Sequence, residues 1–290
     1  MMLLRSLLFT PGNNLRMIAK SGALRADAVI LDLEDAVPPD DKETARLFVR
    51  DSVRDAGRHG SKVFVRINAP ATGLSAEDLK WSVQPGLAGI MLPKSESAED
   101  VASLAAELEK LEAERGIEKG SLGILPLVES ARGLVNAAAV AAASPRVRAV
   151  AFGGVDFTRD LGVALTTEGT ELLVPRATLA IAARAAGVAA LDTPCIDVSD
   201  PARLAAEARI ARGLGFQGKL LIHPSQVGPV NEAFSPTAAE TAAARRVVEA
   251  FEKARAAGSG AIALDGKMID QANYRQAQDC LARAEAGKLQ

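Results

Sequence analysis

Two acidic residues, Glu129 and Asp156, each follow a short apolar run that is typical of a buried strand. The run Gly123–Val128 (GILPLV) leads into Glu129, and the run Val147–Phe152 is followed by two glycines and then by Asp156. If both runs are neighbouring strands, their carboxylates lie on the same rim. Such oxygen ligands suit Mg²⁺, which keeps several waters and takes one or two protein carboxylates. The structural alternative is that each residue caps the helix that follows it.

Polar and ionisable residues recur at the ends of the other predicted strands as well. In a barrel of parallel strands the catalytic groups gather at the carboxyl ends of the strands, so we predict an active site on that rim. The residues that stand at these ends are Asp32, Glu34, Asp35, Arg66, Asn68, Lys94, Glu129, Asp156, Asp192 and His223. We interpret His223 as a hydrogen-bonded structural residue rather than as a catalytic base.

Arg66 is the only cation inside the apolar third strand, VFVRIN. Burying a guanidinium group is costly unless the charge is paired. The partner is either a supporting carboxylate, Glu34 or Asp35, or a substrate carboxylate that Arg66 binds with two hydrogen bonds. The two roles are compatible, and the sequence leaves both open.

A group of basic residues lies near the first strand, beside the turn TPGNN. Arg16 and Lys20 are four residues apart and therefore share one face of a helix, and Arg5 precedes them. One interpretation is solvated surface charge. The other is a docking site for phosphate groups near the mouth of the barrel.

Apolar runs that alternate with helical patterns position these residues. Near-continuous apolar strands separated by helices predict a parallel sheet covered on both faces. Eight such units predict an α/β fold, the (β/α)₈ TIM barrel, over residues 1–235. An open doubly wound sheet is the alternative, but no G-x-G-x-x-G motif opens a helix. Residues 236–290 are predicted to form a C-terminal helical extension, with one helix over 237–257 and a last helix from Met268 to about Glu285.

Composition excludes several classes of partner. The 290 residues carry a net charge of −2 and only 3% aromatic residues, which argues against nucleic-acid and anionic-membrane partners. No apolar segment is long enough to span a bilayer, and the apolar N-terminal run is interrupted by Arg5, unlike a signal peptide. Cys195 and Cys280 fit no metal or redox spacing. We therefore expect a cytoplasmic location.

With these residues in place, the sequence resembles the citrate lyase β-subunit family and its malyl-CoA and citramalyl-CoA lyase relatives. The resemblance spans nearly the whole chain. It depends on the ordered motifs RSLLFTPGNN, AVILDLEDAV, VFVRINAP, IMLPK, ILPLVES, AFGGVDFTRDLG, KLLIHPSQV and DGKMIDQANYRQAQ. One departure is Val155, since many relatives have a glutamate or a small polar residue before the aspartate of the glycine motif.

The resemblance implies a Mg²⁺-dependent carbon–carbon lyase that cleaves a 3-hydroxyacyl-CoA thioester to acetyl-CoA and a 2-oxo acid. It implies that Glu129 and Asp156 are the metal ligands and that Arg66 holds the substrate and steadies the enolate. Asp270 in KMID matches an aspartate that acts as general acid or base in the site of a neighbouring subunit. Arg16 and Lys20 fall where the family contacts the coenzyme A phosphates.

The same resemblance implies a homo-oligomer, a trimer or hexamer, in which the extension packs on a neighbouring subunit. Three other functions stay open from the sequence. They are a malyl-CoA-type thioesterase, an aldolase of the same fold that acts on free acids, and a citrate lyase β subunit that depends on an acyl-carrier partner.

Overall fold

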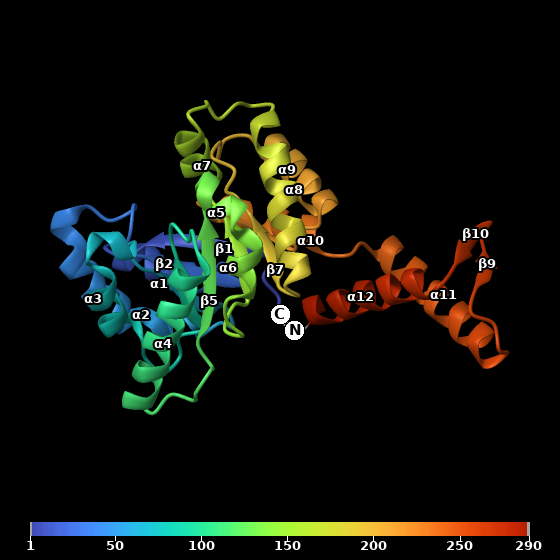
Figure 1. The fold of residues 1–290 in the computed structure, drawn as a ribbon, viewed down its shortest axis with the longest axis horizontal. Helices are drawn as coiled ribbons and strands as arrows, with labels where there is room; N and C mark the ends of the chain where they lie inside the picture. Colours follow the sequence, from blue (N-terminus) through green and yellow to red (C-terminus); the bar gives the residue numbers. More distant parts are fainter. Residues whose placement is uncertain (1, 289–290) are drawn as a thin grey trace. The chain divides into compact units, whose positions relative to one another are not determined.

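Eight parallel strands form a closed barrel in which each strand pairs with the next along the chain (Figure 1). The computed structural model describes residues 2–288, and the barrel closes where Leu7 of the first strand lies opposite Leu220 of the last. The predicted (β/α)₈ barrel is thus confirmed. Its strands are β1 (Ser6–Pro11), β2 (Ala28–Asp32), β3 (Lys62–Arg66), β4 (Gly89–Leu92), β5 (Gly123–Val128), β6 (Ala149–Phe152), β7 (Ala189–Asp192) and β8 (Gly218–Leu221).

Helices follow the strands and cover the outside of the barrel. Several begin at a residue whose side chain accepts a backbone N–H, as Ser97 does for α4, Ser130 for α5 and Asp200 for α9. The helices are α1 (Leu15–Ser21), α2 (Lys42–Gly57), α3 (Ser75–Ser82), α4 (Ala98–Glu114), α5 (Ala131–Val135), α6 (Ala137–Ala142), α7 (Gly154–Leu161), α8 (Thr170–Ala185), α9 (Pro201–Leu214) and α10 (Val227–Phe234), with short 3₁₀ helices η1 (Pro39–Asp41), η2 (Pro70–Thr72) and η3 (Pro224–Gln226).

Alternate residues of each strand fill the barrel interior. Successive side chains of a strand point to opposite faces, so one parity faces inward and the other faces the helices. The inward set is almost entirely apolar and buried, and it comprises Leu7, Ala28, Ile30, Phe64, Met91, Leu125, Leu127, Ala149, Ala151, Leu191 and Leu220. Counting on by two from this set places Asp32, Arg66 and Glu129 on the inward face at the carboxyl ends of their strands.

Buried ion pairs hold the opposite, amino-terminal end of the barrel. Arg5 binds Asp27 at 2.7 Å, directly before β2. Glu112 of α4 accepts hydrogen bonds from Arg146 at 2.6 and 2.7 Å and from two backbone N–H groups in front of β5. Arg5 is therefore not part of the basic group on the catalytic rim. The prediction that grouped it with Arg16 was wrong, because Arg5 precedes β1 whereas α1 follows it.

Replacing Glu112 with Gln is expected to destabilise the fold by on the order of 3 kcal/mol at pH 7. Burial disfavours the charge of Glu112, but Arg146 and the two N–H groups outweigh it and lower the pKa to about 2. Because the pKa of Glu112 is lower in the folded protein than in the unfolded chain, the ionised carboxylate stabilises the fold fully above pH 4.5. This stabilisation is lost as the pH falls towards 2. Urea unfolding at several pH values measures it. A difference between variant and wild type that does not shrink below pH 4.5 contradicts the assignment.

Residues 2–3 and 232–288 form a second compact unit. It contains α11 (Ala238–Ala256), a hairpin of β9 (Ile262–Leu264) and β10 (Lys267–Ile269), and α12 (Gln271–Lys288). Its own core stacks Phe251 on Tyr274, with ring centroids 4.9 Å apart.

The prediction that the last helix begins at Met268 was wrong. Met268 pairs with Ala263 in the hairpin, and the turn at Asp265-Gly266 has positive φ at both residues. Such an Asp-Gly turn is a strong hairpin signal. Within the described residues, no helix is long and apolar enough to cross a membrane.

Candidate active site

Arg66 and Asp32 form the centre of the candidate site. They are directly opposite each other in the register of β2 and β3, both on the inward face. Arg66 donates from Nε and Nη2 to the two oxygens of Asp32 at 2.7 and 2.6 Å, which is a bidentate pair. The sequence predicted Glu34 or Asp35 as partner. Both lie nearby, at 3.1 and 3.8 Å from Nη1, but Asp32 is the main partner.

The charge of Arg66 is retained in spite of its burial. Burial opposes the charge, but Asp32, Glu34 and Asp35 outweigh it and raise the pKa of the guanidinium above its usual value. The guanidinium also lies over the ring of Phe9, 4.7 Å from the centroid. Arg66 is therefore a fixed cation at the mouth of the barrel.

Glu34 lies between two cations on the loop after β2. Asp32 shapes this loop by accepting the backbone N–H groups of Glu34 and Ala36. The Glu34 carboxylate then reaches Arg66 through Oε2 and accepts a hydrogen bond at Oε1 from Nζ of Lys94 at 2.9 Å. Burial raises the pKa of Glu34, and Arg66 and Lys94 act against this rise. Asp35 is exposed at the edge of the same loop.

Lys94 links the ends of β4, β2 and β5. Its backbone N–H donates to Oε1 of Glu129 at 2.8 Å, and its side chain binds Glu34. Lys94 has a φ of 49°, in the left-handed region that side chains other than glycine rarely adopt. This conformation turns the backbone N–H towards the Glu129 carboxylate.

Lys94→Gly is expected to be more stable than Lys94→Ala by about 1 kcal/mol, because only glycine adopts positive φ without strain. Both variants lose the same contact to Glu34, so the comparison isolates the backbone. Urea unfolding of the two proteins provides the measurement. Equal stability, or a more stable alanine variant, contradicts a strained left-handed Lys94.

Glu129 is buried at the end of β5 and does not cap the following helix. That cap is Ser130, whose side chain accepts the N–H of Gly133, so the capping alternative is wrong for Glu129. Burial, with the negative charges of Glu34 and Asp156, raises the pKa of Glu129 to about 8 although the Lys94 N–H lowers it. Arg66 also lowers this pKa, but burial and the two neighbouring carboxylates outweigh it.

Asp156 lies in the first turn of α7, close enough to Glu129 to raise its pKa. The cap of α7 is Gly153 rather than Asp156. Asp156 binds Arg159, one turn on, at 2.6 Å and is partly exposed. A Cβ at Gly153 would meet Oε2 of Glu129 at 2.6 Å, so the first glycine of the motif provides space for the carboxylate.

The residues of this rim fit a magnesium ion. Within the described residues, no group of three or more His, Cys, Asp and Glu side chains is arranged to hold a metal. Glu129 and Asp156 are close enough for their charges to interact, and a pair of carboxylates suits a cation that keeps most of its waters. A cation bound beside Glu129 would favour the ionised carboxylate and would therefore lower the pKa of Glu129.

The other predicted site residues belong to other elements of the chain. Arg16 and Lys20 are exposed on α1, directly after the carboxyl end of β1. Asp270 belongs to the second unit, where its Oδ1 accepts the N–H groups of Ala272 and Asn273 at the start of α12. It is therefore a capping residue, one position before the helix, rather than a residue of its first turn.

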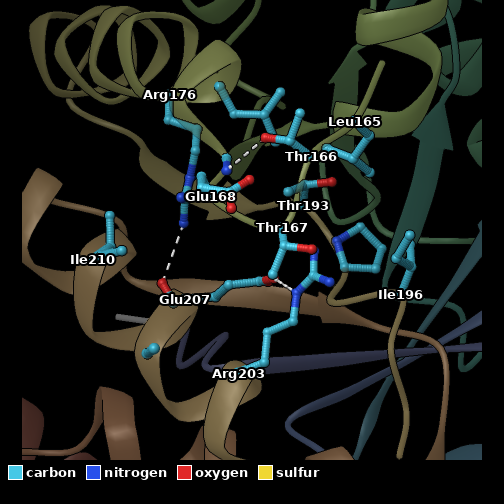
Figure 2. A pocket seen from close by; sticks show the side chains of 14 residues that line it. Leu165, Thr166, Thr167, Glu168, Arg176, Thr193, Ile196, Arg203, Glu207 and Ile210 are labelled. Carbon is cyan, nitrogen blue, oxygen red and sulfur yellow. Dashed lines mark hydrogen bonds and ion pairs between the residues drawn. The ribbon is translucent and has the colours of Figure 1, made fainter. Parts of the chain in front are cut away.

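Asp192 does not face the rim, and the prediction that placed it there was wrong. Leu191 points inward, so Asp192 points to the helices, where it binds Arg176 at 2.8 Å and Lys219 at 2.7 Å. Figure 2 shows a pocket lined by Arg176 of α8 and Arg203 of α9, each of which donates a hydrogen bond to Glu207. The pocket has a volume of about 100 Å³, and none of the predicted site residues lines it.

Sequence reasoning named Asp32 and Asn68 at the strand ends but missed their roles, and it did not single out Lys42 or Asp78. The role of Asp32 is readable from strand register once β2 and β3 are aligned at their ends. Lys42, Asn68 and Asp78 form a polar network beneath the loop after β2, described below. That network joins Lys42 and Asp78, which are 36 positions apart in the sequence, so no local sequence pattern predicts it.

The fold and this rim define a (β/α)₈ barrel with a cluster of carboxylates and cations at the carboxyl ends of its strands. The chain belongs to the HpcH/HpaI aldolase/citrate lyase family, whose pattern matches residues 5–224. The predicted resemblance is confirmed, and the chain is an enzyme of the lyase class.

Two curated relatives and one solved structure illustrate the family. The citrate lyase subunit beta of Escherichia coli K12 is 39% identical over 97% of this chain and 93% of its own. The mitochondrial citramalyl-CoA lyase of Homo sapiens is 33% identical over 98% and 86%. The structure is the protein CitE of Mycobacterium tuberculosis in complex with magnesium, acetoacetate and coenzyme A. It is 34% identical, covers 97% of this chain and 98% of its own, and has a TM-score of 0.78.

Proposed function

We propose that this protein is a Mg²⁺-dependent lyase that cleaves the carbon–carbon bond of a 3-hydroxyacyl-CoA thioester. The substrate is of the malyl-, citramalyl- or citryl-CoA type, and the products are acetyl-CoA and a 2-oxo acid. The observation that carries the proposal is that Glu129 and Asp156 share one rim with the fixed cation Arg66. Magnesium and coenzyme A in the structure of the Mycobacterium tuberculosis relative support it.

Glu129 and Asp156 would hold the magnesium ion. When bound, Mg²⁺ supplies Lewis-acid polarisation of the substrate oxygen that becomes the carbonyl of the 2-oxo acid. Lys94 keeps the Glu129 carboxylate in place through its backbone N–H. The preset position of these groups means that little reorganisation is needed as charge develops during cleavage.

Arg66 and Asp270 serve the other product. As the carbon–carbon bond breaks, the substrate hydroxyl loses its proton to solvent and becomes the carbonyl of the 2-oxo acid, and the electron pair of the broken bond stays on the acetyl-CoA fragment as an enolate. Arg66 offsets this negative charge, because it remains a cation in a buried setting. Asp270, contributed by a neighbouring subunit, donates a proton to the enolate carbon and completes acetyl-CoA. The capping bonds at Oδ1 fix the orientation of the Asp270 carboxylate.

Arg16 and Lys20 bind the coenzyme A phosphates in this proposal. Both cations are exposed on α1 at the carboxyl end of the barrel, where a long acyl carrier approaches the rim. The proposal also includes a homotrimer or hexamer, because Asp270 acts across an interface. A cytoplasmic location remains a prediction and is supported by the two free cysteines.

A second candidate is a subunit that acts on a thioester of an acyl-carrier protein. The similarity to the citrate lyase subunit beta of Escherichia coli favours it, since that protein is by name one part of a larger enzyme. The carbon–carbon chemistry is the same in both candidates. They differ in the group that carries the thioester.

The test is cleavage of malyl-, citramalyl- and citryl-CoA by the purified chain with Mg²⁺ and with a chelator. Metal-dependent release of acetyl-CoA with one 2-oxo acid supports the lyase and identifies its substrate. Release of free coenzyme A thiol indicates a thioesterase instead, and cleavage of free hydroxy-oxo acids alone indicates an aldolase. If the chain cleaves none of these coenzyme A thioesters but cleaves a thioester of an acyl-carrier protein, the result supports the second candidate.

A further inference from the structure

The ammonium group of Lys42 lies beneath the loop that carries Glu34. Its Nζ donates to the backbone oxygens of Leu33 and Glu34 at 2.6 and 2.7 Å and to Oδ1 of Asn68 at 2.7 Å. An ammonium group has three donors, and here each one has an oxygen acceptor. None of the three acceptors is a carboxylate. The group thus binds the main chain of the loop rather than an acidic side chain.

The position of Lys42 is unfavourable for a cation unless these contacts compensate it. Lys42 is the first residue of α2, where the helix dipole is positive and disfavours positive charge. The helix therefore gains nothing from a lysine at this position. The contacts that Lys42 makes to the loop explain why a lysine fits there.

Asn68 and Asp78 hold the same loop from the other side. Asn68 donates from Nδ2 to the oxygen of Leu33 at 2.9 Å and to Asp78 at 2.7 Å, and its backbone N–H also binds Asp78. Asp78 of α3 is fully buried and pairs with Arg46 of α2 at 2.7 Å. The network therefore connects α2 and α3 to the loop.

We propose that Lys42, backed by Asn68, is a positioning residue that fixes the backbone at Leu33–Glu34. The fixed backbone directs the Glu34 carboxylate between Arg66 and Lys94, at 3.1 and 2.9 Å. Lys42 acts on catalysis only through Glu34, which in turn sets the two cations of the rim. This inference rests on the proposed lyase function and deepens it.

The test is Lys42→Met, which keeps the length of the side chain and removes its donors. We expect kcat to fall about 10- to 100-fold, as displaced active-site groups do, with the KM for Mg²⁺ within about twofold. Hydrogen exchange of the amides over residues 33–37 is expected to accelerate at least about tenfold. Lys42→Arg should lie between, because a planar guanidinium cannot place its donors on the same three oxygens.

A double variant with Glu34→Gln separates this role from a merely structural one. If Lys42 acts through Glu34, the double variant loses no more kcat than Glu34→Gln alone. Glu112→Gln is the matched control, since it removes a buried charge at the opposite end of the barrel and is expected to leave kcat and exchange of this loop unchanged. Additive losses in the double variant, or wild-type exchange in Lys42→Met, overturn the inference. If the wild-type chain cleaves no thioester, the proposed function fails, while the exchange experiment still decides the role of Lys42.

Discussion

Asp156→Ala is expected to lower kcat by about 1,000-fold or more while the fold remains intact. In the proposed site, removing Asp156 would leave the cation held by Glu129 alone, and the Lewis-acid contribution of several kcal/mol would be lost. The fold survives because Asp156 is partly exposed and pairs only with the exposed Arg159, a type of contact worth about 0–1 kcal/mol. Steady-state rates and thermal unfolding of the same preparation measure both effects, and a Mg²⁺ titration shows the weakened affinity directly.

Arg159→Ala is the matched control for this experiment. It removes the same ion pair at 2.6 Å but leaves the Asp156 carboxylate on α7. We expect its kcat and Mg²⁺ affinity to stay within a few-fold of wild type. Full activity of Asp156→Ala on the substrate of the wild-type enzyme would refute the assignment of Asp156 as a metal ligand.

A mixture of two inactive variants, Asp156→Ala and Asp270→Ala, is expected to recover activity. If each site combines the Asp156 of one subunit with the Asp270 of its neighbour, mixed oligomers contain some sites with both residues intact. Random assembly of equal amounts into a ring restores about one site in four. The measurement is the rate after the two variants are mixed under conditions that exchange subunits, compared with the unmixed proteins.

The control for the mixture is the double variant Asp156→Ala/Asp270→Ala mixed with wild type. Subunit exchange in this control is expected to lower the share of active sites from about one half to about one quarter if sites are shared between chains, and to leave it at about one half if each chain carries a complete site. No recovery by exchanged single variants, or a wild-type protein that is an active monomer, rules out a cross-subunit role for Asp270.

Most of the barrel follows from sequence periodicity, because each strand is a nearly continuous apolar run between helical patterns. The carboxylates Glu129 and Asp156 were also predictable, since each follows such a run. The error at Asp192 has a simple origin: a strand end has two faces, and only residues in phase with the apolar interior reach the rim. Applying that parity to Leu191 would have turned Asp192 towards the helices.

Other features depend on contacts that no local pattern contains. The prediction misplaced Arg5 because it grouped charged residues by their distance in the sequence. Strand β1 runs between Arg5 and Arg16 and carries the chain from one end of the barrel to the other. The hairpin before Asp270 was missed because its strands have three residues each, too few to show alternation. The prediction of a catalytic role for Asp270 depends on the family resemblance alone, because the local structure shows only a helix cap.

The raised pKa of Glu129 has a consequence for the binding of a metal ion. Burial and the charges of Glu34 and Asp156 raise this pKa to about 8, so near neutral pH most of the metal-free protein carries a proton on Glu129. Carboxylates bind metals in their deprotonated form, so Mg²⁺ bound at the proposed site would displace this proton. The apparent affinity for Mg²⁺ is then expected to rise as the pH increases towards 8 and to level off above it.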